Sequence, residues 1–98
     1  MTQHEIYMNY AFKEAEKAFE KNEIPVGCII VFQNMIVAKA HNLVESLKDP
    51  TAHAEILAIT SAAEYLQSKQ LVGCSMYVTL EPCAMCAGAI VLSKIENL

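Results

Sequence analysis

The sequence has little of what marks a disordered, exported or membrane-spanning chain. Only 18% of its 98 residues are charged, 54% are hydrophobic, and there are three glycines and three prolines. That composition excludes a low-complexity chain. No uncharged stretch reaches the length of about 20 residues that crosses a bilayer, and the N-terminus lacks the basic start and apolar run of a signal peptide. We predict one compact domain over residues 1–98, soluble and cytoplasmic, with no membrane partner.

Cysteine is scarce, and a formal net charge of −4 leaves no excess of basic side chains. Four cysteines could form two disulfides in an exported mini-protein, but nothing in the sequence indicates export. In a reducing compartment, metal binding or catalysis is the more common use of cysteine. The acidic balance argues against nucleic-acid binding through a broad basic face. Any electrostatic grip on RNA would therefore be weak.

The hydrophobic pattern predicts an initial helix followed by a hairpin. Residues 2–5 match a capping box, so a helix should follow and end before Pro25. A solvated face of this helix should carry the charged residues, Glu14 included. Apolar side chains recur at helical spacing and should form one buried stripe: Ile6, Tyr7, Ala11, Ala15, Ala18 and Phe19. Residues 26–32 and 35–40 are apolar and rich in β-branched side chains, which is typical of two antiparallel strands joined by a tight turn.

The second half of the chain predicts a helix, a strand and a helix. Residues 49–69 should form the first of these helices, because Asp followed by Pro is favoured at a helix start. Residues 75–80 have the composition of a strand, and residues 81–93 should form the last helix. Strands joined by a helical crossover should run parallel beside the hairpin partner. We therefore predict an α/β fold with helices on the faces of a mixed sheet.

Cys83 and Cys86 lie three residues apart at the start of the last predicted helix. On a helix, β-carbons at this spacing are about 5–6 Å apart on one face, so two thiolates can reach one ion. The positive end of the helix dipole also favours thiolate over thiol. Zinc is the natural occupant because it accepts sulfur ligands and has no redox chemistry. By itself, such a pair could equally be a redox pair or half of a structural zinc site.

His53 and Glu55 form the second half of the predicted site. Residues two apart diverge in mid-helix, but near a helix start both can project beyond the terminus. With the two cysteines, His53 makes three ligands, and a catalytic zinc keeps its fourth position for a water whose pKa falls to about 7. Glu55 could move protons between that water and a substrate. Taken alone, His53 would be a core or capping histidine and Glu55 a solvated carboxylate.

Two motifs, His53-Ala54-Glu55 and the run from Pro82 to Cys86, resemble the signature of the cytidine/deoxycytidylate deaminase superfamily. Nearly the whole chain is similar to the bacterial tRNA adenosine deaminases within it. Further matching segments are Pro25-Val26-Gly27, His41-Asn42, residues 49–56 and residues 77–90. The resemblance implies a three-layer α/β/α sandwich with strand order 2-1-3. In the family, strands 4 and 5 and C-terminal helical structure follow, and this sequence lacks them.

The resemblance implies a role for each motif residue. Zn²⁺, one ion per chain, would be held by His53, Cys83 and Cys86, and Glu55 would be the catalytic proton shuttle.

Substrate contacts are implied at four further positions. Asn42 would hydrogen-bond the target base and Ile24 would line the base pocket. Ala54 and Pro82 belong to the same substrate-binding set. Residues 43–48, between Asn42 and the zinc-binding histidine, carry an acidic residue and only one basic one. That segment would hold RNA weakly.

The expected activity is zinc-dependent hydrolytic deamination of adenosine to inosine at the wobble position of a tRNA anticodon loop, with the base unstacked into the pocket. Two alternatives stay open. One is deamination of a small-molecule base or nucleoside, guanine or cytosine, which an acidic surface suits. The other is a non-catalytic module stapled by zinc. The uncovered edge of the third strand predicts association with a second chain, so a homodimer is expected.

Overall fold

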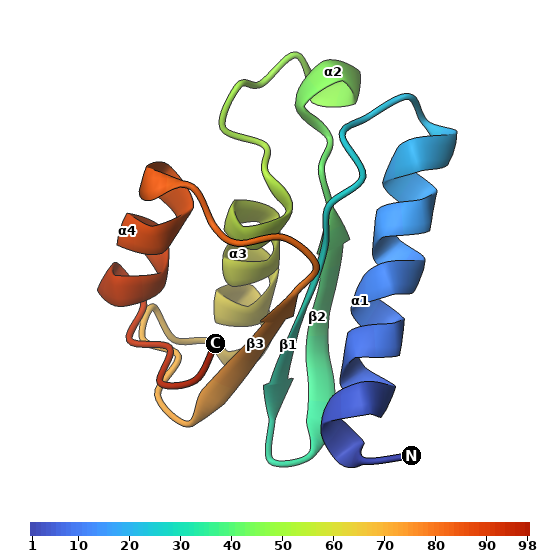
Figure 1. Cartoon of the computed structure of the whole chain (residues 1–98). Coiled ribbons are helices and arrows are strands. Elements are labelled where there is room, and N and C mark those ends of the chain that lie inside the picture. Colours follow the sequence, from blue (N-terminus) through green and yellow to red (C-terminus); the bar gives the residue numbers. More distant parts are fainter.

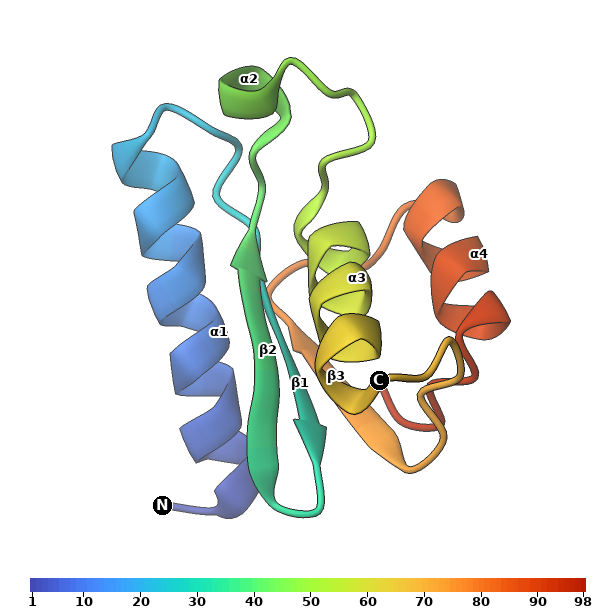
Figure 2. The same cartoon turned by 180° about the vertical axis from the view of Figure 1, so that it is seen from behind.

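The computed structural model describes all 98 residues. Its elements, in chain order, are α1 (Gln3–Glu20), β1 (Gly27–Phe32), β2 (Met35–His41), α2 (Val44–Leu47), α3 (Ala54–Leu66), β3 (Cys74–Val78) and α4 (Ala84–Leu92). Helix α1 covers one face of the sheet, and α3 covers the other with α4 beside it (Figure 1; Figure 2). The predicted α/β architecture in three layers is confirmed. No helix combines the length and the apolar character needed to span a bilayer.

The sheet has the expected order β2-β1-β3, but its pairing differs from the prediction. Strand β1 pairs antiparallel with both neighbours, so the three strands form an antiparallel sheet and the expected mixed sheet is wrong. Strands β2 and β3, which the helical crossover joins, do run in the same direction as predicted. They are not neighbours, because β1 lies between them. Parallel pairing is limited to one bridge at the outer edge of β3, between Ser75 and Asn97.

Helix α1 begins at the predicted capping box. Thr2 is the N-cap: its hydroxyl accepts a hydrogen bond from the Glu5 amide, and the Glu5 carboxylate accepts one from the Thr2 amide. The helix ends in a left-handed residue, Asn22 (φ 61°). The Glu23 amide donates back to the Ala18 carbonyl at 2.9 Å, the bond that closes a Schellman motif. Helix α1 therefore has a rigid exit that sets the direction of residue 23.

The buried face of α1 matches the predicted apolar stripe at Tyr7, Ala11, Ala15 and Ala18 but departs from it elsewhere. Ile6 and Phe19 were expected inside but are 42% and 70% exposed. Glu14 was expected in solvent but is buried at 4% exposure, on the same face as the small residues Ala11, Ala15 and Ala18. Small side chains make most of the close contact with the sheet, and Tyr7 is the one large apolar side chain of α1 that is buried.

Gly27 shows how close this approach is. A β-carbon there would lie 2.0 Å from the carbonyl oxygen of Ala11 and 2.4 Å from the amide nitrogen of Ala15. Both clashes are with backbone, which cannot swing aside as a side chain does. Glycine is therefore the residue that lets α1 contact the start of β1.

Helix α3 begins later than predicted. Its first residue is Ala54 with His53 as the N-cap, whereas the sequence favoured a start at Asp49. The Asp49 carboxylate instead accepts hydrogen bonds from the amide (2.8 Å) and the hydroxyl (2.7 Å) of Thr51. Asp49 thus closes a local turn, the alternative use of a capping residue.

Helix α4 and the 42–48 connection also differ from expectation. Helix α4 begins at Ala84 rather than at residue 81, because Cys83 is extended (φ −73°, ψ 175°) and takes the N-cap position. The connection, expected to be irregular, contains the four-residue helix α2.

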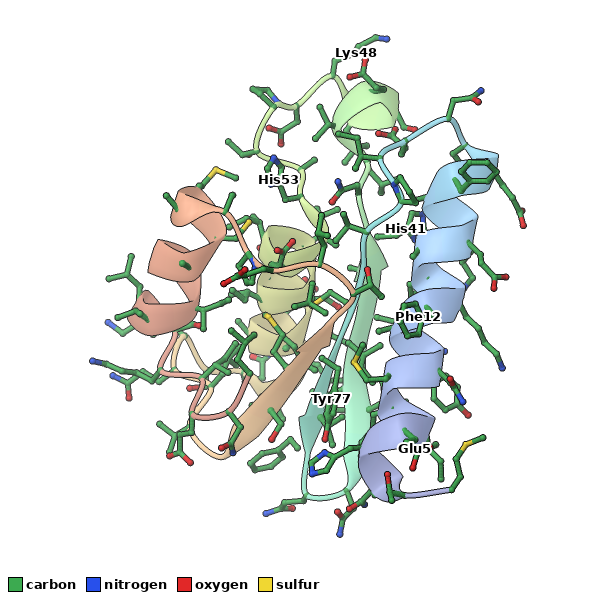
Figure 3. All side chains as sticks on the ribbon, viewed as in Figure 1. Glu5, Phe12, His41, Lys48, His53 and Tyr77 are labelled. Atoms are coloured by element: carbon green, nitrogen blue, oxygen red, sulfur yellow. The ribbon has the colours of Figure 1, made fainter.

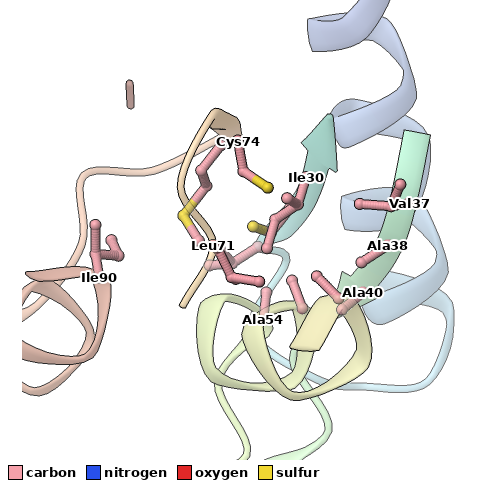
Figure 4. Packing of buried hydrophobic residues seen from close by; sticks show 13 residues of the cluster. Ile30, Val37, Ala38, Ala40, Ala54, Leu71, Cys74 and Ile90 are labelled. Atoms are coloured by element: carbon pink, nitrogen blue, oxygen red, sulfur yellow. The ribbon is translucent and has the colours of Figure 1, made fainter. Parts of the chain in front are cut away.

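The main core lies between the sheet and α3 (Figure 4). It contains 13 buried residues, among them Ile30, Leu71 and Met76. Fully burying one such side chain contributes about 1.5–3 kcal/mol. Ala54 and Ala58 of α3 are completely buried, so small side chains again let a helix approach the sheet closely. This packing fixes the N-terminal end of α3, where the predicted site begins.

Candidate active site

Two helix N-termini meet at the predicted site. His53 is the N-cap of α3 and Cys83 is the N-cap of α4. Both backbones are extended at these positions, so the side chains leave the helix ends instead of lying along them. Figure 3 shows His53 on the segment that enters α3, facing the start of α4. Cys86 reaches the same point from the first turn of α4 and is completely buried.

The three side chains are spaced as ligands of one tetrahedral ion. His53 Nδ1 lies 3.7 Å from Cys83 Sγ and 3.6 Å from Cys86 Sγ, and all three atoms fall within 4.8 Å of one another. Tetrahedral zinc, with bonds of about 2.0–2.1 Å to nitrogen and about 2.3 Å to sulfur, requires a nitrogen-sulfur separation of about 3.6 Å. The donor set and its geometry therefore fit zinc, with room for a fourth ligand.

The two thiols differ in acidity. The Cys86 backbone amide faces the Cys83 sulfur at the start of α4 and lowers the pKa of that thiol. Burial, followed by the negative charge of Glu55, raises the pKa of Cys86 to about 12. A cation bound between the two sulfur atoms would offset both the burial of Cys86 and the charge of Glu55, because a coordinated thiol loses its proton outright. The site is thus electrostatically incomplete with protein atoms alone.

Glu55 lies beside these ligands on the first turn of α3. It is buried at 4% exposure, yet it lines an open cavity of about 180 Å³ together with His53 and Cys83. Cavities for drug-sized ligands measure about 300–1,000 Å³, so this one has the size for a single base. Ile24 and Leu80, both largely exposed, lie at its mouth.

Asn42 lines the same cavity and has a fixed orientation. Its Oδ1 accepts a hydrogen bond from the Ala54 amide at 2.7 Å. Because the oxygen is engaged, the Nδ2 group is left to donate into the cavity. The cavity therefore presents an acid-base group, a hydrogen-bond donor and two of the three candidate ligand residues, His53 and Cys83.

The other two residues predicted to bind substrate, Ala54 and Pro82, do not line this cavity. The Ala54 side chain is buried in the core, and this residue contributes its backbone amide to Asn42. Pro82 lines a neighbouring cavity of about 300 Å³ that runs along β3. A second groove of about 460 Å³ continues from the base-sized cavity and shares Ile24, Asn42 and His53 with it.

Sequence reasoning missed a polar network on the far side of β2. His41 and Glu14 are 2.9 Å apart, Lys17 Nζ donates to Glu14 at 2.7 Å, and Lys21 Nζ lies 3.0 Å from His41 Nε2. A lysine ammonium has no acceptor, so Nε2 must accept and Nδ1 must donate to Glu14. Burial raises the pKa of Glu14, but the hydrogen bonds from Lys17 and His41 and the charge of Lys17 outweigh it and leave that pKa below its usual value. Helical spacing alone cannot reveal a partner 27 residues away.

The fold and the site define the class of protein to which this chain belongs. The profile of the cytidine and deoxycytidylate deaminase zinc-binding region matches residues 1–98, and the chain belongs to this family.

Comparison with individual proteins shows which members of this family the chain is similar to. The tRNA-specific adenosine deaminase of Aquifex aeolicus is 58% identical over 94 residues, which are 96% of this chain and 62% of that protein. A solved structure from a study of A-to-I editing by tRNA:A34 deaminases at the wobble position of transfer RNA superposes with a TM-score of 0.94. It is 41% identical, and the match covers 97% of this chain and 73% of that one.

A guanine deaminase of Bacillus subtilis is also similar in structure. The TM-score is 0.93 at 37% identity, over 99% of this chain and 62% of that chain. The present chain spans about three fifths of the length of the bacterial curated relatives that it matches.

Proposed function

We propose that the protein carries out hydrolytic deamination of adenosine to inosine at the wobble position of a tRNA anticodon loop. The observation that carries this proposal is the placement of Glu55, His53 and Cys83 on one base-sized cavity, with Cys86 close enough behind them to complete a ligand set. Two bacterial relatives, 58% and 52% identical to this chain, are named tRNA-specific adenosine deaminases. The adjoining open groove gives room for the rest of a polynucleotide once one base occupies the cavity.

Each residue has a distinct task in this proposal. His53, Cys83 and Cys86 would hold one zinc ion per chain. When bound, zinc lowers the pKa of a coordinated water to about 7 and so supplies the nucleophile for C6 of adenine. The Glu55 carboxylate takes a proton from the attacking water and delivers it to the adjacent ring nitrogen. The same group then takes the remaining proton from the new C6 hydroxyl and delivers it to the amine, so that the C6 carbonyl forms as the C6–N bond breaks and ammonia leaves.

Other side chains hold and shield the base. Asn42 donates from Nδ2 to an acceptor on the base, since its oxygen is already used. Ile24 and Leu80 pack at the mouth and exclude water, which strengthens the polar interactions inside.

The test is ammonia release from two kinds of substrate. The purified protein, with its metal content measured, is given an anticodon stem-loop RNA with adenosine at the wobble position, and in parallel free adenine, guanine and cytosine. Turnover of the stem-loop alone supports the proposal. Turnover of a free base alone overturns it in favour of a small-molecule deaminase.

Free-base deamination is a second candidate because of the guanine deaminase similarity. A formal net charge of −4 also suits a small uncharged substrate better than RNA. The same panel decides between the two, because guanine lacks the phosphates that would occupy the groove. A non-catalytic zinc module would turn over neither substrate while retaining zinc.

The assembly and location follow as parts of the proposal. We expect a homodimer, as helix α4 leaves Met85, Val91 and Leu92 exposed and soluble monomers seldom expose such patches. A tRNA substrate would place the reaction in the cytoplasm. Sedimentation of the protein at micromolar concentration tests the first point, and a single monomeric species would contradict it.

A further inference from the structure

Glu23 is a buried carboxylate that the proposed chemistry does not use. It is 5% exposed, and its two oxygens accept three hydrogen bonds. Oε1 accepts from the Glu45 amide at 3.0 Å, while Oε2 accepts from the amide and the hydroxyl of Ser46 at 2.7 and 2.6 Å. All three donors belong to helix α2. A glutamate in the loop after α1 therefore holds a helix more than twenty residues away.

Helix α2 depends on this contact. It has only four residues, and its own N-cap, Leu43, has no side chain that accepts a hydrogen bond from the first turn. None of its residues is buried. A helix this short does not form by itself in water, because nucleation costs more than its few bonds return. Glu23 supplies from outside the acceptors that the helix start lacks.

Glu23 is itself held firmly. Its amide donates to Ala18 in the Schellman motif that ends α1, so its backbone moves with that helix. Figure 1 and Figure 2 both place α2 beside the loop that leaves α1, at one end of the molecule. Glu23 thus joins two segments that would otherwise be separate loops.

These two segments form one wall of the groove. Ile24 follows Glu23, and only Leu43 separates Asn42 from the first residue of α2. Both line the base-sized cavity and the groove next to it. The Asn42 amide donates to the Val26 carbonyl at 3.2 Å and the Leu43 amide to the Ala52 carbonyl at 3.0 Å, while the Leu43 carbonyl accepts from the Leu47 amide of α2 at 2.9 Å. Movement of α2 would therefore reach Asn42 through a single intervening residue.

We propose that Glu23 is a positioning residue, whose carboxylate fixes α2 against the end of α1 and thereby fixes the orientation of Asn42 at the mouth of the cavity. Its effect on substrate rests on the proposed deaminase activity, whereas its effect on Asn42 does not. The role requires an acceptor on both carboxylate oxygens. Glutamine keeps the shape of the side chain but turns one of the two oxygens into a donor.

The test compares Glu23→Gln with Glu20→Gln in the full chain. Glu20 is exposed at the last turn of α1, so the control removes the same charge without touching α2. Amide hydrogen exchange is followed at three positions: Glu45 and Ser46 report on α2, and Ala54 reports on Asn42 because it donates to that side chain. Zinc content and the kinetics with the stem-loop are measured on the same samples.

The expected result is specific to Glu23→Gln. Exchange at Glu45 and Ser46 becomes about tenfold faster, and exchange at Ala54 also accelerates. KM for the stem-loop rises about fivefold while kcat stays within about twofold, because substrate is bound less well but Glu55 is unmoved. Zinc content does not change. Ser46→Ala should give a smaller effect in the same direction, and adding it to Glu23→Gln should change little further.

Two outcomes overturn the proposal. If the α2 amides exchange faster while Ala54 and KM stay as in the wild type, Glu23 is only a local cap. If KM changes equally in Glu20→Gln, the effect is one of charge and not of position. A wild-type protein that deaminates no substrate would refute the proposed function, but the exchange measurements would still decide whether Glu23 orients Asn42.

Discussion

Three glutamates are buried in this small domain, and they differ in what surrounds their oxygens. Glu14 is bonded by Lys17 and His41, and Glu23 by the start of α2. Glu55 is buried to the same degree but has the open cavity in front of it. The difference shows that burial of an acid is not by itself a sign of catalysis. A carboxylate whose lone pairs are already used is structural, whereas one that faces a cavity is free to act on a substrate.

Among variants of the three buried glutamates, the largest loss of turnover is expected from Glu55→Gln. Proton transfer by a positioned group contributes about 10²–10⁴-fold to a rate, so turnover should fall by that factor. Zinc content and thermal stability should hold or rise, because the variant removes a desolvated charge that faces a cavity. The measurements are ammonia release, metal analysis and thermal unfolding, with exposed Glu64→Gln on the same helix as the control. A variant that keeps wild-type turnover would remove Glu55 from the chemistry.

Glu14→Gln is expected to reduce stability while leaving turnover nearly unchanged. Weakening the bonds to His41 and Lys17 should lower the free energy of unfolding by about 1–3 kcal/mol, with turnover within about twofold of the wild type. Chemical denaturation measures the first quantity. Glu16→Gln, which alters an exposed carboxylate on the same helix, should change stability by less than about 0.5 kcal/mol. Equal effects of the two variants would show that the Glu14 network contributes nothing.

A double-mutant cycle tests whether Glu14 and His41 stabilise the protein through their mutual contact. Glu14→Gln and His41→Gln should each destabilise the protein, and the double variant should lose about 1 kcal/mol less than the sum, because both remove the same contact. Additive losses would mean that the two side chains do not act through one another.

The smallest expected effect concerns pH. The pKa of Glu14 in the folded protein lies below its usual value of 4.5, so the stability it adds is present above pH 4.5 and is lost as the pH falls through the folded-state value. The wild-type advantage over Glu14→Gln should therefore shrink in acid. Lys17 and His41 face this carboxylate, and Lys21 faces His41. Denaturation curves at pH 6, 5, 4 and 3 test this; a constant difference would contradict it.

Much of the fold could be predicted from local patterns. The capping box at Thr2, the hairpin and the alternation of helices with strands depend on residues close together in the chain. The candidate ligand set also came from local patterns, because His53 lies two residues from Glu55, and Cys83 three residues from Cys86. Each pair needed only a helix start nearby, and an error of several residues in that start did not matter.

The errors came from contacts between distant segments. Asp49 was predicted as an N-cap, but it forms its own turn while packing of the alanines sets the start of α3. Glu14 was predicted in solvent because periodicity cannot detect a histidine 27 residues away. The mixed sheet was wrong because β1 lies between the two strands that the crossover joins.

The sequence by itself determined the family, the ligand types and the approximate place of each element, since these follow from local spacing and the chemistry of side chains. Only the tertiary structure decided which polar groups meet. It brings two helix starts together around one cavity, leaves Glu55 facing that cavity, and uses Glu14 and Glu23 as ties between distant segments. The physical reason is that a hydrogen bond or a metal site needs its atoms within a few ångströms, a condition that only packing of the whole chain can meet.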